Sequence, residues 1–244
     1  MINLALSLAA GLAVATAVRL GTGFGWTGAV APGVVVAAAA YLLLARRSMK
    51  RLEALFEAAH KELRGQHFEK AIQVLESGFA HARWQFLVGA QLHSQLGILH
   101  YARKEFAEAL PHLEKSFSRH GLARAMLAAQ RWRTRDVAGA TKVLEQAVRA
   151  SKKEGLIWCV YAWVLEKEGR HEEAVKVLGR GAAANPSDAK LKAAFQALQN
   201  DKKLKLGKLY EAEWYQFHLE AVPPQVLGGG MVPRGAKRAL YGRR

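Results

Sequence analysis

Cysteine is almost missing from the sequence: Cys159 is the single one among 244 residues. A lone cysteine cannot close an internal disulfide or supply a Cys-x-x-Cys metal site. The sequence also has no His-Glu-x-x-His zinc motif, no Gly-x-x-x-x-Gly-Lys-Ser/Thr phosphate loop and no Gly-x-Ser-x-Gly nucleophile elbow. We therefore expect no enzyme activity, no cofactor, no metal ion and no small-molecule substrate. Cys159 is interpreted as a small, buried packing residue.

Two weaker signals for chemistry are set aside. Residues 23–28 fit Gly-x-Gly-x-x-Gly, but a dinucleotide site needs a preceding strand and a soluble helix with an acidic residue about 20 positions later. His93 and His100 could share one helix face, although two histidines alone are usually packing or surface residues. His171 falls in a predicted turn, where we expect it to be solvated.

Acidic residues are scarce: 20 Asp and Glu stand against 36 Lys and Arg, which gives a formal charge of +16. Three classes of partner fit this surplus, namely anionic lipid, an acidic protein and nucleic acid. Basic patches bind phosphate without reading sequence, but no recognised nucleic-acid module is present, so nucleic acid ranks last. Solvation of helix faces accounts for part of the surplus.

Charged residues are absent from two long stretches, residues 2–18 and 20–45, which Arg19 alone separates. A helix needs about 20 apolar residues to cross the hydrocarbon core of a bilayer, and a glycine-rich run between the stretches breaks a helix. We predict a two-helix transmembrane hairpin over residues 1–45. Small residues that would let the two helices approach in lipid recur every four positions: Ala5, Ala9, Ala13 and Ala17, and then Gly33 and Ala37.

A cleaved signal peptide is the alternative for the first stretch, because Ala13-Val14-Ala15 resembles a cleavage site. The positive residues that precede the apolar part of a signal peptide are missing, so a retained helix is favoured and the alternative stays open. By the positive-inside rule, the hairpin loop faces outward and both termini lie in the cytoplasm. Four cations after the second helix decide this orientation and are expected to face anionic lipid headgroups: Arg46, Arg47, Lys50 and Arg51.

An internal repeat follows the hairpin. Four alanines recur at intervals of about 34 residues: Ala71, Ala109, Ala140 and Ala174. The clearest copy adds Trp158, Ala162, Gly169 and Pro186. This pattern resembles the tetratricopeptide repeat (TPR), in which small residues let helices A and B of one repeat touch. The resemblance implies a juxtamembrane basic helix and about four TPRs in residues 46–186, stacked as an all-α solenoid.

Helix signals continue after the last repeat. Ser187-Asp188 is an N-cap signal, and apolar residues follow at helical spacing. We predict capping helices over residues 187–220, with residues 202–219 as an extension of the first. Residues 221–244 are rich in proline and glycine and are predicted to form a disordered tail. The tail is basic and holds Arg234, Lys237, Arg238, Arg243 and Arg244.

Partners of TPR proteins usually bind the concave face that the A helices form. The resemblance places aromatic and basic residues there, which predicts a partner groove lined by Arg64, Tyr101, Trp132, Arg133, Trp163 and Lys167. The alternative is an imperfect register that makes Trp132 and Trp163 core residues. The Lys/Asn/Arg pattern of the carboxylate-clamp TPRs is not reproduced, so that ligand is not predicted.

The layout is similar to bacterial inner-membrane TPR proteins that accompany haem synthesis or lipopolysaccharide assembly. We therefore predict a membrane-tethered scaffold or adaptor in the bacterial inner membrane, with its TPR domain in the cytoplasm. Its partner is predicted to be a cytoplasmic or membrane protein with an acidic surface. The alternative is a permanent structural subunit of a larger membrane protein complex.

Overall fold

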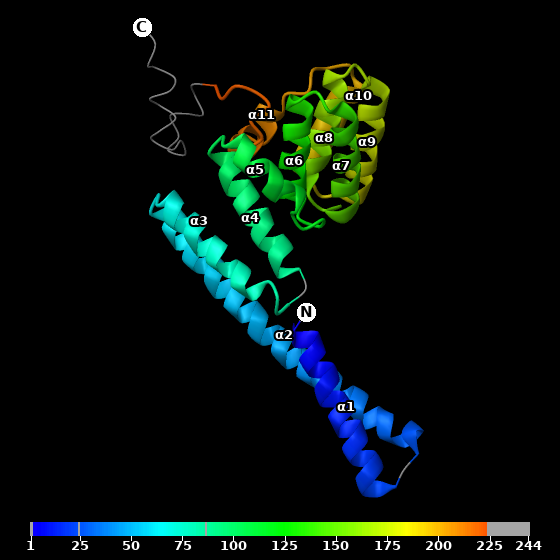
Figure 1. The fold of residues 1–244 in the computed structure, drawn as a ribbon. Helices are drawn as coiled ribbons and strands as arrows, with labels where there is room; N and C mark the ends of the chain where they lie inside the picture. Colours follow the sequence, from blue (N-terminus) through cyan, green and yellow to red (C-terminus); the bar gives the residue numbers. More distant parts are fainter. Residues whose placement is uncertain (1, 24, 86, 224–244) are drawn as a thin grey trace. The chain divides into compact units, whose positions relative to one another are not determined.

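Helices are the only regular secondary structure in the computed structural model, which describes residues 2–23, 25–85 and 87–223 (Figure 1). The all-α prediction is confirmed over these residues. Two compact units, Met1–Leu99 and His100–Arg244, divide the chain, and each is described by itself. The predicted basic tail falls outside the described residues from position 224 onward, together with its cations Arg234, Lys237, Arg238, Arg243 and Arg244.

The order of the helices follows the repeat pattern. The first unit contains α1 (Ile2–Thr22), α2 (Trp26–Arg64), α3 (Phe68–Ser77), the short 3₁₀ helix η1 (Gly78–His81) and most of α4 (Val88–Ala102). The second unit contains α5 (Phe106–Glu114), α6 (Gly121–Arg133), α7 (Val137–Ala150), α8 (Gly155–Lys167), α9 (His171–Ala184), α10 (Ala189–Gln199), α11 (Leu206–Leu209) and α12 (Ala212–Tyr215). Each of α3, α5, α7 and α9 begins three residues before its repeat alanine, so the predicted register fits every repeat.

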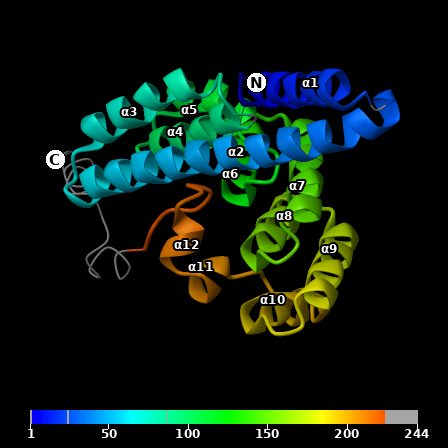
Figure 2. The ribbon, with the colours of Figure 1, turned by 90° about the horizontal axis from the view of Figure 1, so that it is seen from below.

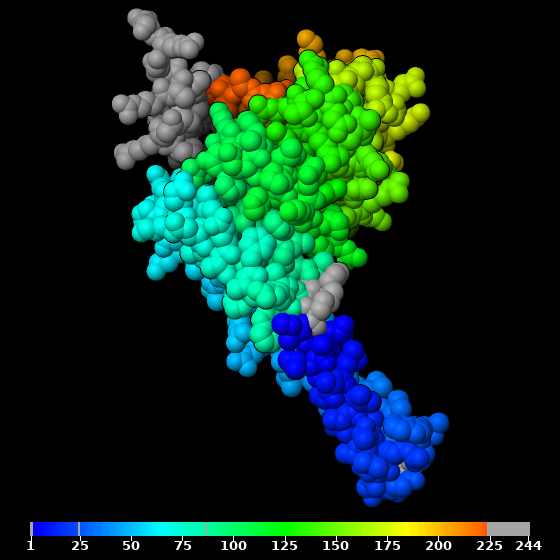
Figure 3. Space-filling view, viewed as in Figure 1, coloured from blue at the N-terminus to red at the C-terminus, as the bar shows by residue number. Residues whose placement is uncertain are grey.

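An antiparallel pair of apolar helices opens the first unit. Figure 3 shows α1 (dark blue) in contact with the first part of α2 (lighter blue). Both helices are long and apolar enough to cross a membrane, and large apolar side chains such as Leu12 and Val35 are exposed. A Cβ atom added to Gly33 would lie 2.6 Å from the carbonyl oxygen of Gly11. The two backbones therefore approach closely at this point, as small residues allow.

The face of α1 that makes this contact differs from the predicted one. The buried residues of α1 are Asn3, Ser7, Gly11 and Ala15. The predicted stripe of Ala5, Ala9, Ala13 and Ala17 is exposed instead. A shift of two positions turns a helix by about 200°, so the predicted stripe lies on nearly the opposite face. Gly11 allows a closer approach than alanine would, and Asn3 finds polar partners at the end of the hairpin. On α2, Gly33 was placed correctly and is buried.

The predicted boundary at residue 45 is not a boundary of the backbone. One helix of 39 residues, α2, runs from the apolar span through the cationic stretch to Arg64. No glycine or proline occurs between residues 33 and 64, and the charged part is rich in Ala, Leu, Glu, Lys and Arg, which favour helix. The juxtamembrane basic helix and helix A of the first repeat are therefore the continuation of the second apolar helix.

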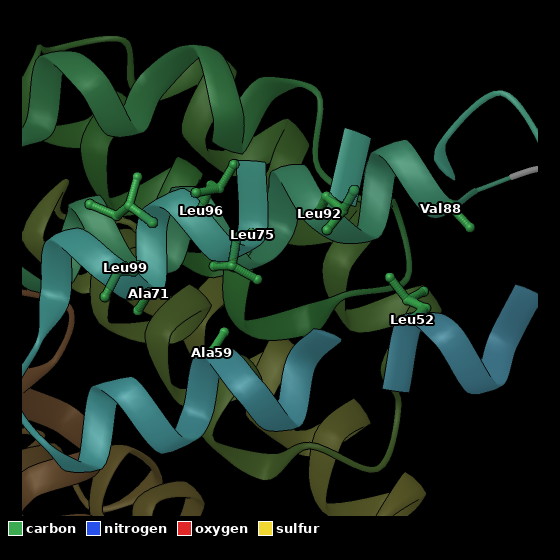
Figure 4. Close-up of a cluster of buried hydrophobic side chains, with 9 residues drawn as sticks. Leu52, Ala59, Ala71, Leu75, Val88, Leu92, Leu96 and Leu99 are labelled. Carbon is green, nitrogen blue, oxygen red and sulfur yellow. The ribbon is translucent and has the colours of Figure 1, made fainter. Parts of the chain in front are cut away.

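The core of the first repeat lies between the second half of α2, α3 and α4 (Figure 4). The repeat alanine Ala71 is completely buried and lets α3 approach α2. Leu92, Leu96 and Leu99 on α4 complete this cluster. The first repeat, which has the weakest sequence pattern, thus forms the expected helix pair and is covered by the next A helix.

The second unit is a stack of helix pairs. α6 packs on α7, α8 on α9, and α10 covers α8 and α9. Ala109, Ala140 and Ala174 have no exposed surface, which confirms that these positions lie where helices touch. Asp188 caps α10 by accepting a hydrogen bond from the Leu191 backbone N–H at 3.0 Å, so the predicted N-cap is also confirmed.

The helix predicted over residues 202–219 does not form. The backbone leaves α10 with a positive φ at Asp201, and further positive φ values at Glu211 and His218 separate and end the short helices α11 and α12. Figure 2 shows α11 and α12 (orange) beside α8 rather than in line with α10. Tertiary packing of the aromatic side chains against the A helices therefore overrides the helical spacing of this segment.

Candidate functional site

Most of the predicted groove residues come together in the second unit. The rings of Trp132 and Trp163 pack edge to face, with centroids 5.0 Å apart. The Lys167 ammonium lies 5.1 Å from the centroid of the Trp163 ring. Burial raises the pKa of the Tyr101 hydroxyl, and the Arg133 guanidinium is near enough to lower it in part. These five residues stand at the C-terminal ends of α4, α6 and α8, which are successive A helices. The sixth predicted residue, Arg64, ends α2 in the first unit.

The groove of the second unit is already occupied by residues 206–220, which we call the C-terminal segment. The Trp214 ring packs against the Trp163 ring with centroids 5.5 Å apart. Trp214 and Phe217 have no exposed surface, and Trp163 is only 3% exposed. The aromatic floor that was predicted to receive a partner thus receives the protein's own C-terminal segment.

Hydrogen bonds fix the C-terminal segment in place. The indole N–H groups of Trp163 and Trp214 both donate to the Glu220 carboxylate, at 3.0 Å and 2.9 Å. The buried Tyr101 hydroxyl donates to the carbonyl oxygen of Phe217 at 2.8 Å. A carboxylate that accepts two indole N–H groups forms charge-assisted bonds. The occupant of this aromatic groove is therefore recognised through one acidic side chain and several aromatic rings.

Burial sets the protonation of the polar groups in the groove. Desolvation raises the pKa of Tyr101, against a lowering by the Arg133 guanidinium, so this hydroxyl stays a neutral donor. Desolvation lowers the pKa of His218, and the nearby Lys104 and Arg133 lower it further. The His218 ring lies between Tyr101 and Phe106, with centroids 5.6 Å and 5.8 Å away. His218 is thus a neutral ring packed among aromatic neighbours.

Cys159 behaves as predicted. Its side chain is completely buried on α8, and desolvation raises the pKa of its thiol to about 12. The Cys159 Sγ atom lies 3.6 Å from the hydroxyl oxygen of Tyr210 in the C-terminal segment. Because a reactive cysteine needs an accessible thiolate, Cys159 is a packing residue.

A basic rim remains exposed around the filled groove. Lys104, Arg133 and Lys167 are all exposed at the ends of the A helices. The Arg133 guanidinium lies 4.0 Å from the centroid of the Phe106 ring. Trp132 is half-buried and donates its indole N–H to Glu168 at 2.7 Å. An incoming partner would therefore meet cationic groups first and only the edge of the aromatic cluster.

The four cations predicted to face lipid headgroups lie on α2 immediately after its apolar part. All four side chains are exposed: Arg46, Arg47, Lys50 and Arg51. Their contact with lipid headgroups stays a prediction.

The three histidines singled out in the sequence each have a neighbour within the fold. His93 packs against Phe79, with ring centroids 4.8 Å apart, and His100 pairs with Glu105 at 2.8 Å. His171 starts α9, where its side chain is 40% exposed, in line with the expected solvation, and its ring lies 2.7 Å from the Glu166 carboxylate. Among residues 2–23, 25–85 and 87–223, no group of three or more His, Cys, Asp or Glu side chains could hold a metal ion.

Sequence reasoning missed the role of Glu220. A signal for the segment before it was present, since Leu206, Tyr210, Trp214 and Phe217 are large apolar residues in an otherwise charged stretch. Their spacing was interpreted as one face of a straight helix. Only the reversal of the chain after α10 brings them, and Glu220, to the A helices.

The fold is that of a helical-repeat protein in which helix pairs are stacked and the C-terminal segment packs against the A helices. The sequence model described as "Tetratricopeptide repeat" matches residues 131–198, from the last turn of α6 into α10. Residues 131–198 are thus matched as tetratricopeptide repeats, as the repeat spacing predicted, and such repeats support a role as a protein-interaction scaffold.

Two solved structures are similar in part of the chain. "MamA 41-end from Desulfovibrio magneticus RS-1" is 15% identical, with a TM-score of 0.45 over 68% of this chain and 94% of its own. "MamA RS-1 ArsTM double mutant" is 16% identical, with a TM-score of 0.46 over 68% of this chain and 92% of its own. None of the curated proteins matches the sequence.

Proposed function

We propose that this chain is a membrane-anchored TPR scaffold that holds its repeats on the cytoplasmic side of a bacterial inner membrane and binds an acidic protein there. The observation that carries the proposal is the continuity of α2. One 39-residue helix contains an apolar span and also helix A of the first repeat. With no break between the two parts, the anchor and the first repeat move as one rod.

The surface of the hairpin supports the anchor. Its outward side chains are large and apolar, and Leu12 and Val35 are 66% and 67% exposed. Exposed apolar surface of this extent is unfavourable in water and favourable in lipid. The tight packing of Gly11 against Gly33 and the burial of Asn3 against α2 support a retained helix, because a cleaved leader has no need of such contacts.

The charge distribution supports the orientation. Arg46, Arg47, Lys50 and Arg51 follow the second apolar helix, whereas Arg19 alone stands near the hairpin loop. Short cationic flanks stay on the cytoplasmic side. The repeats, which follow these four cations directly along α2, are then cytoplasmic as well.

The basic rim supports an acidic partner. The aromatic interior of the groove is closed by the C-terminal segment, so the accessible part is the rim of Lys104, Arg133 and Lys167. Exposed charges of one sign steer and orient partners of the opposite sign. The acidic and aromatic character of the C-terminal segment, with Glu220 between two indole N–H groups, supports a partner of similar chemistry.

Two experiments test the proposal. After expression in a bacterium, the full chain should remain in membranes washed at alkaline pH, and release by that wash would refute the anchor. Crosslinked partners captured from those membranes should be lost in the Lys104→Glu/Lys167→Glu variant. The matched control, Lys142→Glu/Lys176→Glu, reverses two exposed charges on B helices and should keep them.

The outcomes separate the two candidate roles. Equal capture by both double variants would exclude the rim as the binding surface. An adaptor should elute alone after extraction in detergent, because its rim contacts are exposed and screened by salt. Constant co-elution with the same companions at high salt would favour a permanent subunit of a larger membrane complex instead.

A further inference from the structure

Residues 82–85, which follow η1 and form the loop discussed below, are hydrogen-bonded to the start of the membrane hairpin. The backbone N–H of Ile2 donates to the carbonyl oxygen of Arg83 at 3.1 Å, and that of Asn3 donates to Trp84 at 3.2 Å. The first N–H groups of a helix have no partner within the helix. A loop of the first repeat thus caps α1 from outside.

A buried polar cluster strengthens this junction. The Asn3 side-chain amide donates to the Ser48 hydroxyl at 2.8 Å and to the Gln85 side-chain oxygen at 3.1 Å. The Gln85 amide donates in turn to the Tyr41 hydroxyl at 3.2 Å. Asn3 is only 2% exposed. Hydrogen bonds therefore join the loop, the start of α1 and the middle of α2 at the same position along the hairpin. Water cannot easily replace these bonds.

The dimensions of the hairpin set the depth of that level. α1 has 21 residues, which is roughly 31 Å at the usual helical rise, against a hydrocarbon core of about 30 Å. Its first residues must then lie near the boundary between hydrocarbon and headgroups. Ser48, which bonds Asn3, follows directly after Arg46 and Arg47 on α2, so the charge pattern gives the same depth.

The side chains of the loop suit this depth. Trp84 is 39% exposed although it is a large aromatic residue, and Met49 on the adjacent part of α2 is 40% exposed. Trp84 and Arg51 line the same small cavity, together with Ser48 and His81. Tryptophan is enriched at the level of lipid headgroups, where its ring and its N–H both find suitable surroundings.

We propose that the loop of residues 82–85 is a third membrane contact, with Trp84 inserted at the cytoplasmic headgroup level beside anionic phospholipids held by Lys50 and Arg51. The inference rests on the proposed anchoring function and adds to it a contact from the repeat region itself. Two separate attachments, the hairpin and this loop, hold the first repeat at a fixed height and prevent it from rotating about α2.

The test measures depth in the full chain, reconstituted into nanodiscs of phosphatidylcholine with or without phosphatidylglycerol. A Cys159→Ala background leaves one thiol for a nitroxide at Trp84→Cys, Leu12→Cys or Lys70→Cys. Collision with oxygen reports lipid, and collision with a water-soluble nickel chelate reports solvent. Leu12 faces outward on α1 and Lys70 is exposed on α3, so they give the lipid and aqueous references.

We expect the Trp84 label to show several-fold less nickel collision than the Lys70 label and a depth between those of Lys70 and Leu12. A Trp84 label as accessible to nickel as Lys70, with Leu12 in lipid, would overturn the third contact and leave the anchor intact. A Leu12 label exposed to nickel would overturn both proposals.

A second arm tests the class of lipid. Phosphatidylglycerol should slow the motion of the Trp84 label, and Lys50→Gln/Arg51→Gln should remove that effect. An effect of the same size in the charge-neutral variant would show that anionic headgroups are not held by these two residues.

Discussion

Removal of one buried ring from the C-terminal segment tests whether that segment is an integral part of the fold. Trp214 has no exposed surface, packs against Trp163 and Phe217, and donates its indole N–H to Glu220. A buried tryptophan covers about 150–250 Å², which at about 25 cal/mol per Å² corresponds to roughly 4–6 kcal/mol as an upper bound. We expect Trp214→Ala to lower the free energy of unfolding by about 3–5 kcal/mol.

The assay is thermal melting of the full chain in detergent, followed by helical circular dichroism. For a chain of this size, 1 kcal/mol shifts Tm by about 2–4 °C, so the expected loss is roughly 6–20 °C. Glu213→Ala changes an exposed neighbour on α12 and should shift Tm by little, since such surface changes stay within about 0.5 kcal/mol.

Glu220→Gln provides an independent check of the same packing. Glutamine keeps one acceptor oxygen for an indole N–H but turns its amide group toward the other, which leaves one buried donor without an acceptor. The expected cost is about 1–3 kcal/mol. If Trp214→Ala has the same Tm as the Glu213→Ala control, and Glu220→Gln has the same Tm as the wild type, the segment does not fill the groove.

Three further variants probe other parts of the structure by melting. Gly33→Leu should destabilise the hairpin by about 1–3 kcal/mol through overpacking, whereas lipid-facing Val34→Leu should not. Ala174→Glu buries an unpaired charge where α8 and α9 touch and should abolish cooperative melting, whereas Lys176→Glu should leave it intact. His218 has a lowered pKa in the folded state, so acid protonates the unfolded chain first and stability falls as pH drops below about 6.5. His218→Asn, which tolerates the positive φ, should weaken that pH dependence.

The local features of the repeats could be predicted because they repeat. Ala71, Ala109, Ala140 and Ala174 all proved fully buried, and Asp188 caps the helix that it was predicted to cap. These positions depend on contacts within one helix pair, which the spacing of the sequence determines.

The predictions that proved wrong concern features that depend on contacts between distant parts of the chain, which the spacing of residues in the sequence does not reveal. The change of hydropathy at residue 45 was taken as the end of a helix, but charge changes along α2 without any residue that breaks a helix. The alanine stripe from Ala5 to Ala17 was chosen by size alone. The observed stripe includes Asn3, whose partners Ser48 and Gln85 are more than 40 residues away in the sequence.

The groove shows the same limit. The structure brings together five of the residues named from repeat position, although Trp163 is buried and their role in partner binding stays a prediction: Tyr101, Trp132, Arg133, Trp163 and Lys167. Their occupant came from a reversal of the chain after α10, and the bond from Trp163 to Glu220 spans 57 residues. The pattern of a single repeat contains no information about whether a later segment of the chain folds back onto the repeats.

The central claim is that one continuous helix carries the repeats on the cytoplasmic side of the membrane. It is tested most directly by reporters fused after Gly23 in the hairpin loop and after Arg244. A phosphatase that works only outside the cytoplasm should be active after Gly23 and inactive after Arg244, and a fluorescent protein that folds only inside should show the reverse. Phosphatase activity after Arg244 would place the repeats outside and contradict the account.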